Sequence, residues 1–159
     1  MKITLFMTMS LNGITSDDTG TEDFLADKNW DLFTEKANET GCVIWGRKTY
    51  EAVKTWPEEY LKKLKAEIIV VSRKGKSPFE ALKEAANKGY KEAILAGGPE
   101  TNTYFLKEKL VDEIIVNIEP VLASGKKYLF EATGIMQELQ LLNERKIGGI
   151  IQLHYKVLK

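Results

Sequence analysis

The chain has 159 residues, of which 43% are hydrophobic and 29% charged, as is typical of one soluble globular domain. It contains no signal-like N-terminus and no long apolar run, so a cytoplasmic location is expected. Basic and acidic residues number 23 each, so the zero net charge favours neither nucleic acid nor an acidic membrane surface. The single cysteine, Cys42, excludes an internal disulfide, and the single histidine, His154, argues against a histidine triad or a multi-histidine metal site.

The chain begins with a predicted strand at residues 2–9, and a strand placed this early usually pairs centrally. Residues 10–22 follow as a long loop rich in Gly, Asp, Thr and Asn. Long loops in compact domains are often lids or binding loops, so this loop is a candidate cover over a site, with surface disorder as the alternative. The next predicted element is a helix at residues 27–40.

Apolar side chains recur at three- and four-residue spacing along this helix. Asp27 lies at the rim of the apolar face and Asp31 lies somewhat further round. A carboxylate at such a rim suits the orientation of a substrate, although a helix start favoured by the helix dipole equally explains Asp27. Trp30 and Phe33, with Val53 in the following helix, are candidates for the apolar walls of a pocket or for ordinary core.

Cationic residues follow two predicted strands, at residues 41–45 and 67–71. The residues after these two strands are Gly46, Arg47, Lys48 and Thr49, and then Ser72 and Arg73. If the two strand ends are neighbours, they form one pocket of fork-shaped donors and point charges that suits a phosphomonoester. The alternative is a set of solvated loop residues.

A third junction joins a buried strand at residues 93–96 to a helix that begins at Pro99. Gly97 and Gly98 lie between them, and Glu100 and Thr101 continue the helix. Adjacent glycines let backbone N–H groups approach a ligand closely, and a helix N-terminus favours phosphate. The pattern predicts a seat for a diphosphate, with a tight turn that binds nothing as the plainer alternative.

The remaining pattern predicts a helix at residues 78–88, a strand at 111–118 and a hairpin of strands at 137–144 and 150–158. Strands and helices thus alternate until the chain ends in strands alone. This order predicts an α/β fold with a mostly parallel sheet, an antiparallel C-terminal hairpin and helices on both faces. Ligands bind beyond the carboxyl ends of such strands, so the three junctions are expected to share one site.

Several short motifs occur in a characteristic order along nearly the whole chain. They are Met-Ser-Leu-Asn-Gly at residues 9–13, Trp-Gly-Arg-Lys-Thr-Tyr at 45–50, Val-Ser-Arg at 71–73, Ala-Gly-Gly at 96–98 and Leu-Val-Asp-Glu at 110–113, with Pro120 and Val121. This ordered set resembles the dihydrofolate reductase superfamily, and in particular the branch that includes the C-terminal reductase domain of the riboflavin biosynthesis protein. The resemblance implies a single three-layer domain over residues 1–159.

The resemblance also implies NADPH as hydride donor. The phosphates of NADPH would contact Gly46, Arg47, Lys48 and Thr49. The 2′-phosphate would contact Ser72 and Arg73. The diphosphate and nicotinamide side would contact Gly97 and Gly98, with Pro99, Glu100 and Thr101. In this superfamily the glycine pair carries an unusual cis peptide. The loop at residues 10–22 resembles the mobile active-site loop.

The substrate is expected to be a pterin-type heterocycle, held by Asp27 or Asp31 and walled by Trp30, Phe33, Thr49 and Val53. The intact Gly-Arg-Lys-Thr motif favours dihydrofolate reductase and hence folate and one-carbon metabolism. Two departures count against a single branch: no arginine matches the one that holds the folate carboxylate, and Asn12 stands where the riboflavin-type branch has aspartate. The alternative activity is 5-amino-6-(5-phosphoribosylamino)uracil reductase of riboflavin biosynthesis.

A module that binds a nucleotide without turnover is a further alternative, because the phosphate seats have more support in the sequence than the catalytic acid. A purely structural protein would bind no NADPH. The resemblance to the riboflavin-type branch also implies a homodimer.

Overall fold

The computed structural model describes residues 1–132 and 134–159, and these form a seven-stranded sheet in the order β3-β2-β4-β1-β5-β7-β6. The elements are β1 (Lys2–Ser10), α1 (Lys28–Thr40), β2 (Cys42–Gly46), α2 (Arg47–Val53), α3 (Glu58–Leu61), β3 (Glu67–Val71), α4 (Pro78–Asn87), β4 (Glu92–Leu95), α5 (Pro99–Lys107), β5 (Glu113–Glu119), β6 (Leu139–Ile147) and β7 (Ile150–Val157). The predicted alternation is confirmed. Helix α3 is unpredicted, because four residues are too few for a helical period.

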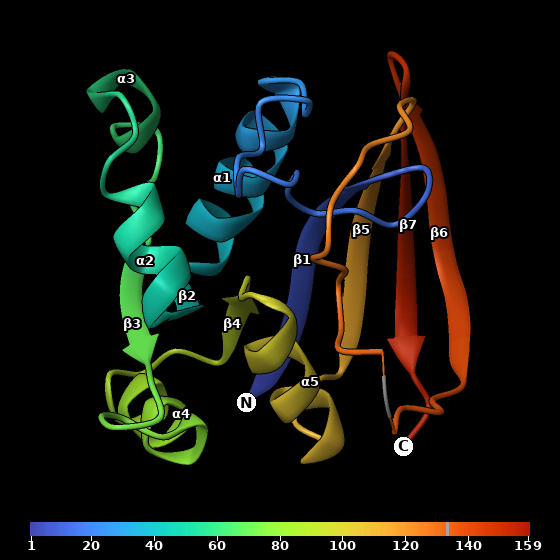
Figure 1. The fold of residues 1–159 in the computed structure, drawn as a ribbon. Coiled ribbons are helices and arrows are strands. Elements are labelled where there is room, and N and C mark those ends of the chain that lie inside the picture. The colour runs from blue at the N-terminus through green and yellow to red at the C-terminus, as the bar shows by residue number, and fades with distance from the viewer. Residues whose placement is uncertain (133) are drawn as a thin grey trace.

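Strands β3, β2, β4, β1 and β5 run parallel to one another, whereas β7 is antiparallel to both of its neighbours, β5 and β6. As expected for an early strand, β1 pairs on both sides, with β4 and with β5. The C-terminal hairpin is also confirmed, and its turn contains Gly148 at a φ of 60°, a left-handed conformation that glycine adopts readily. Figure 1 shows this hairpin at the end of the sheet away from the helices.

Helices cover both faces of the sheet, as the alternating side chains of β2 show. In β2, Cys42 and Ile44 pack with residues of α4 and α5, whereas Val43 and Trp45 pack with residues of α1 and α2. All four side chains are at most 2% exposed, and each large one contributes about 1.5 to 3 kcal/mol through burial. The three-layer arrangement predicted from the sequence is therefore confirmed.

Strand β6 forms the outer edge of the sheet, and only Ile147 at its end is half-buried. Leu139, Leu141 and Leu142 in this strand are 40% to 49% exposed. Exposed apolar groups on an edge strand are a common place for association. The homodimer stays a prediction, which light scattering of the purified protein tests.

Helix α4 begins with a reciprocal cap. Ser77 Oγ accepts a hydrogen bond from the Glu80 amide, and the Glu80 carboxylate accepts one from the Ser77 amide. We predict that Ser77→Ala lowers the free energy of unfolding by about 1 kcal/mol, measured by urea titration. Ser77→Thr is the control that keeps the hydroxyl, and equal losses for both variants contradict the prediction.

Candidate functional site

The carboxyl ends of β2 and β3 lie side by side, because the two strands pair in parallel with their last residues opposite each other. The expectation of neighbouring strand ends is therefore confirmed. Arg47 and Lys48 follow β2 and are exposed, whereas the half-buried Ser72 and the exposed Arg73 follow β3. This corner of the sheet presents three cations and a hydroxyl, a donor set that suits an anion.

The glycine junction before α5 packs directly against the end of β2. A Cβ atom at Gly46 would lie 2.6 Å from Thr101 Oγ1, and one at Gly97 would lie 2.8 Å from Thr101 Cβ and 3.0 Å from Asn102 Oδ1. A Cβ atom at Gly98 would meet nothing within 4 Å. Close packing of α5 thus requires two of these glycines, whereas Gly98 borders open space.

The backbone of the junction differs from the expectation. Every peptide bond between described residues is trans, so the prediction of a cis peptide at Gly97 and Gly98 is wrong. Gly98 is extended, with φ −71° and ψ 172°, and Pro99 begins α5 directly after it. Trans is also the lower-energy form of a non-proline peptide bond. The Gly97 amide donates to Asn102 Oδ1 at 3.1 Å, which fixes the approach of the strand to the helix.

Arg73 forms an ion pair with Glu100 in the first turn of α5. The pair joins the end of β3 to the glycine junction, so the predicted phosphate and diphosphate residues lie within one area. The Arg73 side chain is 82% exposed and that of Glu100 is 46% exposed. An ion pair this exposed adds little stability, so Arg73 can exchange Glu100 for an anionic ligand at little cost.

The first half of the predicted covering loop is held against a segment that follows β5. The Thr15 amide donates to the Lys127 carbonyl at 2.9 Å, and Ser16 bridges to Lys127. Asn12 accepts from the Ala123 amide at 3.0 Å and donates to the Ala123 carbonyl at 2.8 Å. This part of the loop is therefore anchored, and its role as a cover stays a prediction.

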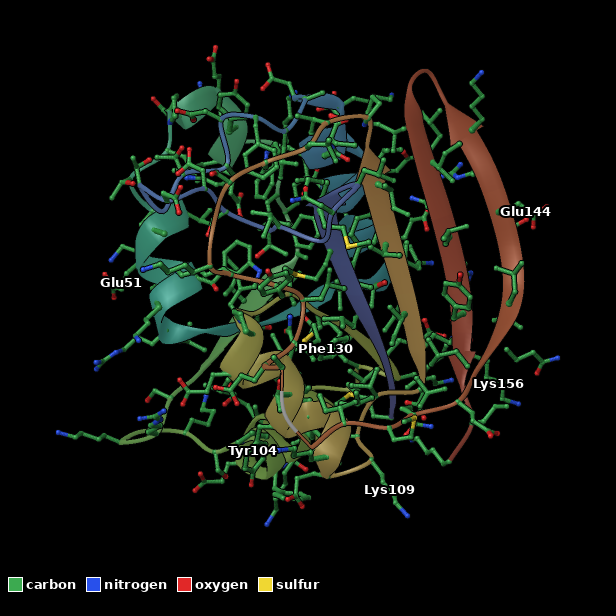
Figure 2. All side chains as sticks on the ribbon, turned by 45° about the vertical axis from the view of Figure 1, so that its right-hand side comes forward. Glu51, Tyr104, Lys109, Phe130, Glu144 and Lys156 are labelled. Atoms are coloured by element: carbon green, nitrogen blue, oxygen red, sulfur yellow. The ribbon has the colours of Figure 1, made fainter. Side chains whose placement is uncertain are left out.

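The same segment runs along α5 and joins the loop to the glycine junction. Asn102 Nδ2 donates to the Leu129 carbonyl at 2.9 Å, and the Glu131 amide donates to Thr103 Oγ1 at 2.8 Å. Phe130, between them, lies beside α5 (Figure 2) and packs against the core. Sequence periodicity gives no signal for residues 120–131, since they form neither helix nor strand.

The two candidate acids of the sequence lie at the start of α1. Asp27 is exposed and occupies the N-cap position without a side-chain cap hydrogen bond. Asp31 pairs with Lys63 at 2.6 Å, and its side chain is 42% exposed. That hydrogen bond raises the pKa of Lys63. The choice between the two acids stays a prediction, and neither carboxylate is buried.

Three of the four predicted wall residues, Trp30, Phe33 and Val53, lie in the apolar layer between the sheet and the helices. Phe33 and Val53 are 7% and 6% exposed. Trp30 stacks on Phe33 at 5.3 Å between ring centroids and donates its indole N–H to the Tyr60 carbonyl at 2.8 Å. Thr49 is half-buried in α2. These contacts fit core packing, and contact of the four side chains with a substrate stays a prediction.

Sequence reasoning missed Glu119, a carboxylate at the carboxyl end of β5. It is 5% exposed and accepts hydrogen bonds at Oε1 from the Ala26 amide at 2.7 Å and from Asn29 Nδ2 at 3.1 Å. Glu119 also lines a pocket of about 290 Å³ with residues 23–26, Pro120 and Val121. The only signal in the sequence is a charged residue directly after an apolar strand.

A larger pocket, of about 640 Å³, lies at the opposite end of the strands, where β1 and β5 begin and β7 ends. It is lined by both chain ends, including Met1, Lys2, Asp112 and Lys159. Ion pairs occupy its rim, with Lys2 bound to Glu113 at 3.0 Å and Lys159 to Asp112 at 2.6 Å. None of the predicted site residues lines it, so the strand carboxyl ends remain the candidate site.

Residues 52–153 match the RibD C-terminal domain family. The chain belongs to this family. Among curated proteins it is 28% identical to the "Uncharacterized protein YwjB" of Bacillus subtilis (strain 168), over 97% of both chains.

Several solved structures share the fold of this chain. A putative riboflavin biosynthesis protein from Shewanella sp. PV-4 is 20% identical over the full length of both chains, with a TM-score of 0.79. A pyrimidine reductase-like protein from Corynebacterium diphtheriae is 15% identical, covering 99% of this chain and 92% of that one, with a TM-score of 0.78.

The bifunctional diaminohydroxyphosphoribosylaminopyrimidine deaminase/5-amino-6-(5-phosphoribosylamino)uracil reductase from Thermotoga maritima is 13% identical, with a TM-score of 0.73. Our chain spans 99% of its own length and 56% of that protein. These likenesses show a dihydrofolate reductase-like fold.

For this RibD C-terminal domain protein, family membership indicates an oxidoreductase. The expected dihydrofolate reductase activity and its place in folate metabolism are not supported, and the riboflavin alternative fits the family better. The intact Gly-Arg-Lys-Thr motif was a misleading guide, because the resemblance assigns it to the phosphates of NADPH, the donor expected for either activity. Among the described residues, no helix has both the length and the apolar character needed to cross a membrane.

Cys42 is fully buried in β2, and burial raises the pKa of its thiol to about 11. Since the thiolate is the reactive form, we predict that iodoacetamide does not label the native protein at neutral pH and labels it fully in urea. Mass spectrometry reads the result. Rapid labelling without urea contradicts the burial of this strand.

Proposed function

We propose that the protein is an NADPH-dependent reductase of the pyrimidine reductase type, acting on 5-amino-6-(5-phosphoribosylamino)uracil or a close relative. Membership of the RibD C-terminal domain family carries the proposal. The convergence of three strand-end junctions at one edge of the sheet supports it, since ligands of open α/β sheets bind beyond such ends.

The donor set fits NADPH in charge and shape. Arg47, Lys48 and Arg73 supply cations for three phosphate groups, and Ser72 adds a hydroxyl. Gly98 borders open space where a side chain would otherwise stand, and the first turn of α5 leaves amide N–H groups without helical partners. When bound, NADPH supplies a hydride.

The protein's own contribution is geometry and exclusion of water. In this proposal the cations fix the phosphates, and the glycine junction leaves room for the diphosphate. The loop at residues 10–22 covers the reacting face, held at one end through Thr15 and Ser16. The heterocycle lies toward the start of α1 and the end of β5.

The test is consumption of NADPH with the phosphoribosylaminouracil, beside dihydrofolate and with NADH as the alternative donor. We predict turnover of the pyrimidine, no turnover of dihydrofolate, and a preference for NADPH of about tenfold or more, the usual value of one charge-assisted contact. Consumption of dihydrofolate alone contradicts the substrate assignment. Tight NADPH binding without turnover of either substrate supports the binding module instead.

A further inference from the structure

A row of buried polar side chains crosses the sheet beneath the start of α1. Its members are Asn29 of α1, Asn117 and Glu119 of β5 and Gln152 of β7, each at most 8% exposed. The surrounding cluster on this face of the sheet is apolar. Burying polar groups costs free energy unless they are hydrogen-bonded, so these four side chains are expected to bond to one another or to neighbouring groups.

Four hydrogen bonds join the row to the edge strand as a chain. Arg145 Nε in β6 donates to Gln152 Oε1 at 2.8 Å, and Gln152 Nε2 donates to Asn117 Oδ1 at 2.8 Å. Asn117 Nδ2 donates to Asn29 Oδ1 at 3.1 Å, and Asn29 Nδ2 donates to Glu119 Oε1 at 3.1 Å. The chain therefore runs from a cation at the edge of the sheet to a carboxylate beside a pocket.

The groups at its two ends dictate the direction of the chain. A guanidinium only donates and a carboxylate only accepts, so each amide between Arg145 and Glu119 has one orientation that satisfies both neighbours. All the dipoles then point the same way, and aligned hydrogen bonds strengthen one another in a buried site. The chain acts as a rigid support for the Glu119 carboxylate.

Only one oxygen of that carboxylate is used by the support. Oε1 accepts from Asn29 and from the Ala26 amide at 2.7 Å. Within residues 1–132 and 134–159, Oε2 accepts no hydrogen bond. It is also not one of the fully buried polar atoms that lack a partner, so it is accessible, and Glu119 lines the pocket of about 290 Å³. A fixed acceptor with one open position is suited to an N–H donor.

We propose that Glu119 orients the substrate by accepting hydrogen bonds from the ring N–H or amino groups of a nitrogen heterocycle. Glu119 takes the role that the sequence assigned to Asp27 or Asp31, which are exposed or bound to Lys63. The class of heterocycle rests on the proposed function. Arg145 acts from β6 as a positioning residue. Its neighbour in sequence, Glu144, points away from the sheet (Figure 2).

The test is isothermal titration with 5-amino-6-(5-phosphoribosylamino)uracil in the presence of NADP⁺, with NADPH titrated separately. Glu119→Gln keeps the side-chain shape and an oxygen for Ala26 and Asn29, but presents an NH₂ donor to the pocket. We expect binding of the pyrimidine to weaken about tenfold or more, with NADPH affinity unchanged. Pyrimidine affinity within about twofold of the unmodified protein overturns the proposal.

Arg145→Met tests the support without touching the pocket, and Lys146→Met is its matched control. Both residues are exposed cations of β6, but Lys146 lies opposite Ile151, outside the chain of hydrogen bonds. We expect Arg145→Met to raise KM for the pyrimidine about threefold to tenfold at unchanged kcat, and Lys146→Met to change neither. Equal effects of the two variants overturn the positioning role.

The two measurements separate this inference from the proposed function. Binding of the pyrimidine that depends on Glu119, without consumption of NADPH, supports the inference and contradicts the reductase. Turnover that does not depend on Glu119 supports the reductase and overturns the inference. An unmodified protein that does not bind the pyrimidine overturns both.

Discussion

An Arg73→Ala protein is expected to bind NADPH about tenfold to a hundredfold more weakly, while its affinity for NADH stays the same. Arg73 follows β3, at the corner where the cations gather, and the 2′-phosphate distinguishes the two cofactors. A hydrogen bond to a charged group contributes about 1.5 to 3 kcal/mol, which corresponds to this range of affinity. Titration of intrinsic fluorescence with each cofactor gives the two dissociation constants.

The control variant is Lys74→Ala, which removes a neighbouring cation that is not assigned to the phosphate. If the two variants weaken NADPH equally, general attraction rather than a fork-shaped contact explains the loss. An unchanged ratio of NADPH to NADH affinity in Arg73→Ala places the 2′-phosphate elsewhere.

A companion variant, Glu100→Gln, is expected to strengthen NADPH binding about twofold to threefold, because exposed ion pairs contribute about 0 to 1 kcal/mol. The substitution releases Arg73 from its ion pair and removes a negative charge near the phosphates. Weaker binding in this variant indicates that the pair orients Arg73 for the cofactor. The NADPH affinities of the unmodified protein and of Glu100→Gln should both fall as salt is added, since screening weakens contacts to phosphate.

The fold was readily predicted because its signals are local. Strand β3 at Glu67–Val71 is an uninterrupted apolar run apart from its first residue, and α1 carries apolar side chains at helical spacing. Alternation of such segments leaves few arrangements other than a mostly parallel sheet with helices on both faces. The single turn of α3 gave no comparable signal.

The cationic part of the site was predictable for the same reason. Arg47 and Arg73 each come directly after a strand, and parallel strands bring their carboxyl ends to one edge. Local sequence and a general rule of topology were enough to place them together. The arrangement allows these cations to bind phosphate, and the titrations of Arg73→Ala with NADPH and NADH test whether Arg73 does so.

The carboxylate was harder to predict, because its surroundings come from distant parts of the chain. Glu119 meets Asn29 across 90 residues, and Asn117 meets Gln152 across 35. These contacts follow from the register of β5 with β7 and from the placement of α1, which no local period encodes. A helical wheel favoured Asp27 over Asp31 by the angle to the apolar face, and it had no means of finding Lys63 beside Asp31.

The glycine pair offers the sharpest separation of packing from ligand binding. Gly97→Ala is expected to lower the free energy of unfolding by about 1 to 3 kcal/mol, the usual cost of an overfilled core. The added Cβ would lie 2.8 Å from Thr101 Cβ and 3.0 Å from Asn102 Oδ1, and buried Asn102 also anchors the segment after β5. Urea titration measures the loss.

Gly98→Ala is expected to have the opposite profile. Its φ of −71° suits alanine, and the new Cβ would meet no protein atom within 4 Å, so stability should stay within about 1 kcal/mol of the unmodified protein. If the diphosphate lies against this glycine, the methyl group occupies its place and NADPH affinity falls about tenfold or more. Unchanged affinity in a folded Gly98→Ala protein means that Gly98 contacts no ligand, and the diphosphate must then lie elsewhere along the strand ends.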